Sequence, residues 1–190
     1  QRTQWPVDGS QWLVAKIQGD PALQRQFIRM GPSARWSTRA INAYYARVAT
    51  FREKLAVLVH VTAGQPARAP ELLSIRHENT TGGHRNIFIE DGMVVFVTTY
   101  HKGFHTSNDI KVIHRYVPRE VGELVIWYLW LVRPFIQRIQ AWRQHQAHTC
   151  MEGHERGTYL WGIDPNGQAW TSERFRQVFM GERKKCLLGK

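Results

Sequence analysis

The clearest pattern in the chain is a stripe of apolar residues that recurs every three or four positions. Its members are Ile41, Tyr44, Tyr45, Val48, Phe51, Leu55, Leu58, Val59 and Thr62. This spacing follows the period of an α-helix and predicts one long amphipathic helix with Tyr44 and Tyr45 in the core. Ser37 or Thr38 can cap its start, and Gly64 marks its end. The basic side chains predicted to face outward are Arg39, Arg47, Arg52 and Lys54.

Two short helices are predicted before this stripe. The first carries Trp12, Leu13 and Ile17 on its apolar face and ends at Gly19. The second begins at Asp20-Pro21, a typical helix start, and is expected to end at Gly31-Pro32.

The middle of the chain changes to an extended pattern. Residues 86–90, 93–100 and 110–117 are rich in β-branched and aromatic residues, which predicts three strands. Asp91-Gly92 is a hairpin signal between the first two, and a polar turn over residues 101–109 separates the last two. We therefore predict that these three strands form one small antiparallel sheet.

Helices are predicted on both sides of the sheet. A short one covers residues 71–76, and a strongly apolar one starts at Pro118 and is kinked or ended by Pro134. A further helical stretch, a loop over residues 144–158 and a last helix capped by Thr171-Ser172 complete the chain. The predicted fold class is mixed α+β, mostly α, with one small antiparallel sheet.

Charge narrows the choice of partner. The formal net charge is +11, with net charges of +6 over residues 1–60 and +4 over residues 171–190. A basic folded domain favours a polyanionic partner, most often nucleic acid, although an unrelated basic α/β adaptor has the same composition. Cys150 and Cys186 form no CxxC pair, so free thiols in a reducing compartment are expected. The most apolar run, residues 124–132, is too short to span a bilayer.

The stretch TAGQPARAPELL, residues 62–73, joins the long helix to the region of the sheet. Gly64 and Pro66 end the incoming helix, and Pro70 fits the first turn of an outgoing one. Arg68 lies at this corner, where its planar guanidinium can bind a phosphate. The plainer alternative is a surface arginine at a helix start.

The order of these elements resembles the catalytic domain of the tyrosine recombinases, the phage-integrase class. TAGQPARAPELLSIRHEN is similar to their motif T-G-x-R-x-S-E-L-L, with two extra residues after the glycine and Pro70 in place of serine. Lys102, in TTYHKGFH, matches the family's lysine in the turn between the second and third strands. IHRYVPREVGELV and GQAWTSERFRQVF resemble the family's strand-to-helix junction and the segment before its His-x-x-Arg box.

A narrower similarity covers residues 36–180. The blocks GQPARAPELLSIRH, GGHRNIFIEDGMVVFVTTYHKG and IHRYVPREVGELVIWYLWLVRPF resemble the recombinase-like region of fungal crypton elements. They resemble equally a region of fungal subtelomeric RecQ-like helicase proteins. The resemblance implies the end of a core-binding-like helical region over residues 1–35, part of a catalytic domain over residues 36–190, and a nuclear location.

The resemblance also implies roles for individual residues. Arg68 would neutralise the phosphate, Lys102 would protonate the leaving oxygen, and Glu71 would orient Arg68. The implied partner is duplex DNA, with self-association on DNA, no membrane and no cofactor. Further DNA contacts are expected from His101, His105, Arg76, Arg174, Arg176, Lys184 and Lys185.

The chain departs from the family in its second half. None of the nine histidines is followed three residues later by arginine, and the last tyrosine, Tyr159, precedes the segment that resembles the pre-box helix. We expect the missing residues to follow Lys190, so that this fragment holds half an active site, has no nucleophile and does not cleave DNA. The alternative is a non-catalytic DNA-binding module of a helicase-like protein.

A metal site is the other candidate chemistry. His145, His148, Cys150 and His154 lie close together in sequence, but their spacing matches no standard zinc finger. No metal is therefore predicted, and no P-loop indicates ATP chemistry.

Overall fold

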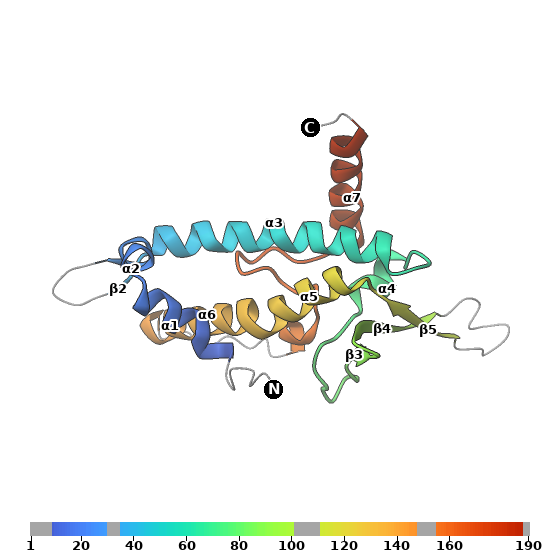
Figure 1. Ribbon diagram of the computed structural model, residues 1–190, viewed down its shortest axis with the longest axis horizontal. Coiled ribbons are helices and arrows are strands. Elements are labelled where there is room, and N and C mark those ends of the chain that lie inside the picture. The colour runs from blue at the N-terminus through green and yellow to red at the C-terminus, as the bar shows by residue number, and fades with distance from the viewer. Residues whose placement is uncertain (1–8, 30–34, 101–110, 148–154, 188–190) are drawn as a thin grey trace. The chain divides into compact units, whose positions relative to one another are not determined.

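The computed structural model describes residues 9–29, 35–100, 111–147 and 155–187. Its contacts divide the chain into two compact units. The first comprises residues 1–47 and 124–152, and the second comprises residues 48–123 and 153–190. Two of the three divisions fall within α3 (Thr38–Thr62) and α5 (Arg119–Trp127), which are labelled in Figure 1. The predicted family-domain boundary between residues 35 and 36 stays a prediction.

The first unit begins with two short helices, α1 (Gly9–Gly19) and α2 (Pro21–Phe27). The carboxylate of Asp20 caps α2 by accepting hydrogen bonds from the backbone N–H groups of Ala22 and Leu23, at 2.8 and 3.3 Å. Pro21 needs no partner at this position because it has no N–H. The predicted boundary between the two helices at Gly19-Asp20 is confirmed.

The predicted end of the second helix at Gly31-Pro32 is wrong. α2 ends at Phe27, and the chain continues as β1 (Ile28–Arg29), which pairs antiparallel with β2 (Arg35–Trp36). The backbone N–H of Ser37 donates to the Phe27 carbonyl at 2.7 Å. The β-branched Ile28 therefore takes an extended conformation, because its strand partner lies several residues ahead.

The long helix forms as predicted. α3 runs from Thr38 to Thr62, and the hydroxyl of Ser37 accepts a hydrogen bond from the N–H of Ala40 at 3.3 Å. Most of the apolar stripe is buried, whereas Leu58 is 38% exposed. Arg52 was predicted to face outward, but it is buried, 2% exposed. Arg52 follows Val48 by four residues and precedes Leu55 by three, so it lies on the buried face of the helix.

Pro134 changes the type of helix and does not end it. α5 passes into a π-helical turn, η1 (Tyr128–Val132), and then into α6 (Arg133–Ala147). Proline has no N–H to donate to the carbonyl four residues earlier, and the wider turn accommodates this loss. The N–H of Arg133 donates to the Tyr128 carbonyl. α6 also covers residues 144–147, which were predicted to belong to a loop.

Aromatic side chains fill the core of the first unit. Phe135 of α6 contacts Trp36 and Tyr44 edge to face, with ring centroids 6.1 and 5.3 Å apart. Phe27 contacts the same two rings at 6.5 and 6.2 Å. Such pairs contribute about 0.5–1.5 kcal/mol each beyond the burial of their area.

The second unit contains the predicted sheet. Its strands are β3 (Ile87–Glu90), β4 (Met93–Tyr100) and β5 (Lys111–Tyr116), paired antiparallel in the order β3-β4-β5. Asp91 and Gly92 form the first turn, both with positive φ. The structure thus confirms a mixed, mostly helical fold with a small three-stranded antiparallel sheet.

Three further helices belong to the second unit. Two are short, α4 (Ala69–Leu73) and the 3₁₀ helix η2 (Glu155–Thr158), and the third, α7 (Ser172–Leu187), is longer. α4 begins and ends earlier than the predicted 71–76, because Pro70 is already in its first turn. The hydroxyl of Thr171 caps α7 as predicted, accepting from the N–H of Arg174 at 3.1 Å.

One prediction concerns the contact between α1 and η1. A Cβ added to Gly9 would overlap the carbonyl oxygen of Trp130 and lie 2.8 Å from its ring. We expect Gly9→Ala to lower the free energy of unfolding by about 1–3 kcal/mol through overpacking. Gly19→Ala is the matched control, because a Cβ there meets nothing within 4 Å. Urea denaturation of both variants measures the difference, and equal stabilities would contradict this contact.

Candidate functional site

The candidate site is the corner between α3 and α4. Gly64, with φ of 76°, ends the incoming helix as the sequence predicts. Arg68 occupies the N-cap position of α4 in an extended conformation, and its carbonyl accepts from the N–H of Leu72 at 3.0 Å. Ala67 and Leu72 are buried on either side of it. The backbone of the corner is therefore anchored in the core.

The side chain of Arg68 points away from that core. It is 60% exposed, and its Nε lies 4.0 Å from Oε1 of Glu71. Glu71 is itself mostly buried, with 11% of its side chain exposed. The structure thus brings together two of the residues that the sequence assigned to one site, an exposed arginine and a mostly buried carboxylate.

A third residue, Arg115 of β5, completes this arrangement. Its side chain is 5% exposed, and its Nη2 donates to Oε2 of Glu71 at 3.1 Å. Its Nη1 donates to the carbonyl of Gln65, and its Nε to the hydroxyl of Thr98 at 3.2 Å. One carboxylate therefore lies between a buried and an exposed guanidinium, and the three side chains carry a net charge of +1.

Sequence reasoning did not single out Arg115. It lies between Ile113 and Val117 on the inward face of β5, but Val112 and Tyr116 make the outward face apolar as well. Because both faces of this strand look apolar, the alternation of the sequence does not separate the inward from the outward set.

His60 lies on α3 within the electrostatic influence of Arg115. Burial lowers the pKa of His60 first, and the positive charge of Arg115 lowers it further. Its ring contacts Phe175 and Phe179 of α7 edge to face, at 5.1 and 5.2 Å between centroids. These surroundings favour the neutral imidazole, which serves here as a packing residue.

The other predicted site residues lie in different settings. Lys102, His101 and His105 lie outside the described residues. Arg76 is engaged within the unit, because it donates to the hydroxyls of Thr80 and Tyr159 at 2.7 and 2.6 Å and stacks on the Tyr159 ring. A phosphate contact by Arg76 would compete with these bonds.

The four predicted residues of α7 fall into two groups. Arg176, Lys184 and Lys185 are exposed, and two of them make contacts along the helix, Arg176 with Glu173 and Lys185 with Glu182. Arg174 belongs instead to an internal cluster, with 15% of its side chain exposed. Burial alone would lower the pKa of Arg174, but hydrogen bonds to Glu53 and Asp164 raise it overall.

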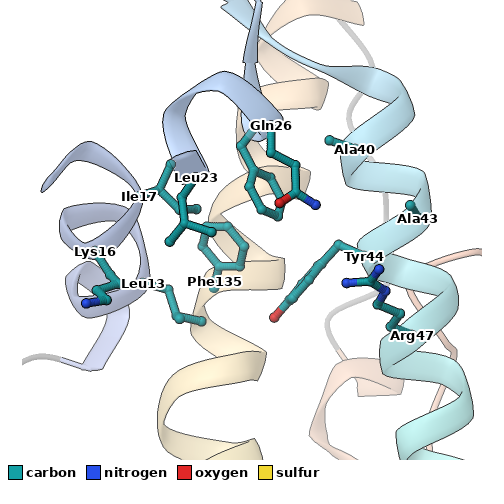
Figure 2. A pocket seen from close by; sticks show the side chains of 11 residues that line it. Leu13, Lys16, Ile17, Leu23, Gln26, Ala40, Ala43, Tyr44, Arg47 and Phe135 are labelled. Atoms are coloured by element: carbon teal, nitrogen blue, oxygen red, sulfur yellow. The ribbon is translucent and has the colours of Figure 1, made fainter. Parts of the chain in front are cut away.

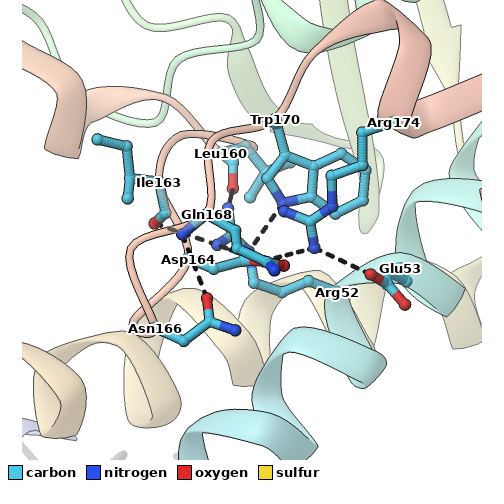
Figure 3. Close-up of polar contacts among 9 residues, drawn as sticks. All are labelled: Arg52, Glu53, Leu160, Ile163, Asp164, Asn166, Gln168, Trp170 and Arg174. Atoms are coloured by element: carbon cyan, nitrogen blue, oxygen red, sulfur yellow. Dashed lines mark hydrogen bonds and ion pairs between the residues drawn. The ribbon is translucent and has the colours of Figure 1, made fainter.

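This internal cluster is centred on the carboxylate of Asp164, whose side chain is fully buried (Figure 3). Arg52 of α3 and Trp170 bind Oδ1, the latter through its indole N–H at 3.0 Å. Arg174 binds Oδ2 at 2.6 Å and Oε1 of Glu53 at 2.9 Å. Two arginines are thus balanced by two carboxylates.

Arg52 also binds the backbone of the loop that carries Asp164. Its Nη2 donates to the Leu160 carbonyl at 3.0 Å, and its Nη1 to the Ile163 carbonyl at 3.3 Å. The Trp170 ring lies against both guanidiniums, 5.9 Å from that of Arg52 and 4.6 Å from that of Arg174. These contacts join α3, residues 160–170 and α7, so the cluster holds the second unit together.

Metal and membrane candidates gain no support. The side chains considered for zinc, His145, His148, Cys150 and His154, lie outside those that the structure describes. Within the described part of the chain, no group of three His, Cys, Asp or Glu side chains is placed to bind a metal ion. No described helix combines the length and apolarity needed to cross a membrane.

No protein-family model matches the chain, and no solved structure matches it at a significant level. The resemblance to tyrosine recombinases stays a prediction.

The Asp164 cluster yields a stability prediction. Asp164→Asn keeps the shape of the side chain but leaves the buried Arg52 and the nearby Arg174 with one counter-charge fewer. We expect a loss of about 3–5 kcal/mol in the free energy of unfolding, because an uncompensated charge remains in the core.

Urea denaturation at neutral pH measures this loss. Glu123→Gln is the matched control, since it breaks the exposed pair between Arg119 and Glu123 at 3.1 Å. Exposed pairs of this kind contribute little, so no measurable change is expected. A loss below about 1 kcal/mol for Asp164→Asn would show that the cluster does not support the fold.

Proposed function

We propose that this chain binds duplex DNA as a tyrosine-recombinase-like domain, with Arg68 in contact with a backbone phosphate. The observation that carries the proposal is the chain of contacts from buried Arg115 through Glu71 to exposed Arg68. Because the salt bridge to Arg115 fixes Glu71, the exposed side chain of Arg68 lies beside a carboxylate that is held in place.

The electrostatics of the corner suit an anion. With one carboxylate between two guanidiniums, the net charge of +1 attracts a phosphate, and the planar guanidinium can bind two of its oxygens at once. The exposed basic residues of α7, Arg176, Lys184 and Lys185, add a sequence-independent attraction. We place Lys102 at the same phosphate on the strength of the family resemblance alone.

We further propose that these 190 residues do not cleave DNA. A tyrosine nucleophile needs an accessible hydroxyl that loses its proton readily. Burial raises the pKa of Tyr44 and Tyr45, and a hydrogen bond to Glu90 raises that of Tyr116. The hydroxyl of Tyr159 accepts a hydrogen bond from Arg76. Of the six tyrosines, these settings favour the protonated hydroxyl at Tyr44, Tyr45 and Tyr116, and engage that of Tyr159 in a hydrogen bond.

The alternative of a non-catalytic module in a fungal RecQ-like helicase protein shares the same DNA contacts. The two differ in the sequence that follows residue 190 in the gene. A His-x-x-Arg box and a later tyrosine would favour the recombinase, and helicase motifs alone would favour the module.

The binding prediction is a salt-dependent affinity for duplex DNA with little sequence preference. Each phosphate neutralised contributes about −0.9 to the slope of log affinity against log salt concentration. Arg68→Gln is expected to weaken binding about 3- to 10-fold at low salt and to reduce that slope by about one unit. Fluorescence anisotropy of a labelled duplex measures the affinity and its salt dependence, over a range of roughly 50 to 200 mM salt.

Arg119→Gln is the control, because Arg119 is an exposed arginine of the same unit whose side chain is 80% exposed. It should leave affinity and slope unchanged. Lys102→Gln combined with Arg68→Gln tests whether both residues act on one phosphate, since non-additive losses report coupling. Equal effects of Arg68→Gln and Arg119→Gln would overturn the role of Arg68, and a salt slope near zero would overturn DNA binding.

The catalytic prediction is the absence of a covalent DNA adduct. Incubation of the chain with nicked duplex substrates, followed by denaturing electrophoresis and mass spectrometry, should give no phosphotyrosine. No tyrosine follows residue 159. In addition, one clamping arginine without its partner leaves part of the negative charge of the transition state unpaired, which raises the activation free energy by roughly several kcal/mol. A phosphotyrosine on any of the six tyrosines would refute this part of the proposal while leaving DNA binding in place.

A further inference from the structure

Two of the buried polar groups that lack a hydrogen-bond partner among the described residues are titratable in different ways. Tyr44 lines an open pocket of the first unit (Figure 2), but its hydroxyl is buried, and burial raises its pKa. That hydroxyl keeps its proton at neutral pH. His60 of the second unit is the other case, because an imidazole changes its charge near neutral pH.

His60 lies where α3 meets α7. It belongs to the last turn of α3, and its ring packs edge to face against Phe175 and Phe179, with centroids 5.1 and 5.2 Å away. The two phenylalanine rings stack on each other at 6.3 Å and lie one turn apart on α7. The three rings therefore form one cluster that joins the two helices.

The buried nitrogen of this imidazole is Nδ1, which makes no hydrogen bond to any described residue. In the neutral ring one nitrogen is an acceptor, and an unpaired acceptor at Nδ1 is compatible with an apolar setting. In the imidazolium ion both nitrogens are donors, so Nδ1 would become a charged donor without an acceptor. Protonation of His60 is therefore unfavourable in the packed state.

β5 and α4 bring one ion pair to this region. Burial lowers the pKa of His60 first, and the positive charge of Arg115 of β5 lowers it further. Glu71 of α4 is bound to Arg115 at 3.1 Å and also lies beside Arg68. One carboxylate thus serves two arginines and does not compensate a third positive charge at His60.

The carboxylates of α3 and α7 near this contact are paired as well. Glu53 of α3 binds Arg174 at 2.9 Å, and within α7 Glu182 binds Lys185 at 2.6 Å. The other charged residues of these two helices near the cluster are the pair Glu173 and Arg176, at 2.7 Å, and the cations Lys54 and Arg183. Each of these carboxylates is thus already bound to a cation.

We propose that His60 makes the contact between α3 and α7 sensitive to pH. At neutral pH the uncharged ring packs against Phe175 and Phe179 and stabilises the docked helix. When the ring gains a proton, water can solvate its charge only if the phenylalanines move away, so acid loosens the contact. Arg174 keeps its bonds to Asp164 and Glu53, so the loosening affects the turns of α7 that follow Arg174.

The pH range follows from the direction of the shift. Because the pKa of His60 in the folded chain lies below its ordinary value of 6.5, the unfolded chain binds more protons in the range just below that pH. The stabilisation by His60 is therefore complete above pH 6.5, decreases below it, and is lost once the pH is under the lowered pKa. Carboxyl groups ordinarily titrate near pH 4, so a comparison between about pH 7.5 and about pH 5.5 reports on histidines.

A dye on Cys186 measures the motion of α7, because this free thiol is exposed near the end of the helix. Cys150→Ser in the full 190-residue chain leaves Cys186 as the single cysteine. We expect the anisotropy of the dye to fall when the pH is lowered through this range. The unfolding temperature of the same chain should fall by about 2–4 °C.

Variants assign the response to His60. His60→Gln removes the titrating ring, so its anisotropy should be the same at both pH values. His114→Gln is the matched control, since His114 is an exposed histidine of β5 in the same unit and its removal should leave the pH response unchanged. NMR titration of the His60 ring in the unchanged chain needs no variant at this position, and its midpoint should lie below 6.5 and coincide with that of the anisotropy change.

Three results would overturn the proposal. They are a dye anisotropy that does not change with pH, an equal change in His60→Gln and in the unchanged chain, and a His60 ring that titrates at or above its ordinary value of 6.5. None of these measurements uses DNA, so they stand or fail separately from the proposed DNA binding.

Discussion

The second unit depends on one buried carboxylate. Asp164 accepts hydrogen bonds from Arg52, Trp170 and Arg174, which come from α3, from the loop that carries Asp164 and from α7. A charge without a partner in the core is costly, so these groups are stable there only together. Folding of α3, the loop and α7 is thereby coupled, because each supplies a charge or donor that the others need.

Arg115 is another buried charge in this unit. It is a buried cation whose donors are satisfied by Glu71, the Gln65 carbonyl and Thr98. Through these bonds, β5 holds the corner after α3 in place. Arg68 gains an ordered neighbour in Glu71, although most of its own side chain is exposed. The candidate phosphate site thus depends on a salt bridge whose buried member comes from β5, more than 40 residues later in the chain.

Local sequence was sufficient for most of the elements. The spacing of apolar residues predicted α3, and Asp91-Gly92 placed the hairpin between β3 and β4 within a residue of its observed position. Local sequence failed where a distant partner decides the conformation, as at Ile28, which pairs with Trp36. Arg52 is a different case, because its spacing placed it on the buried stripe and only its charge argued otherwise.

The sequence by itself determined most of the helical and extended segments, the basic character of both ends, and the presence of Arg68 at a corner that Gly64, Pro66 and Pro70 define. These properties follow from backbone preferences and charge, which act over a few residues. Only the tertiary structure decided that Arg115 contacts Glu71 next to Arg68, that Arg52 meets Asp164, and that the Tyr44 hydroxyl is buried without a hydrogen-bond partner among the described residues. Those contacts join residues far apart in the chain, and packing selects them.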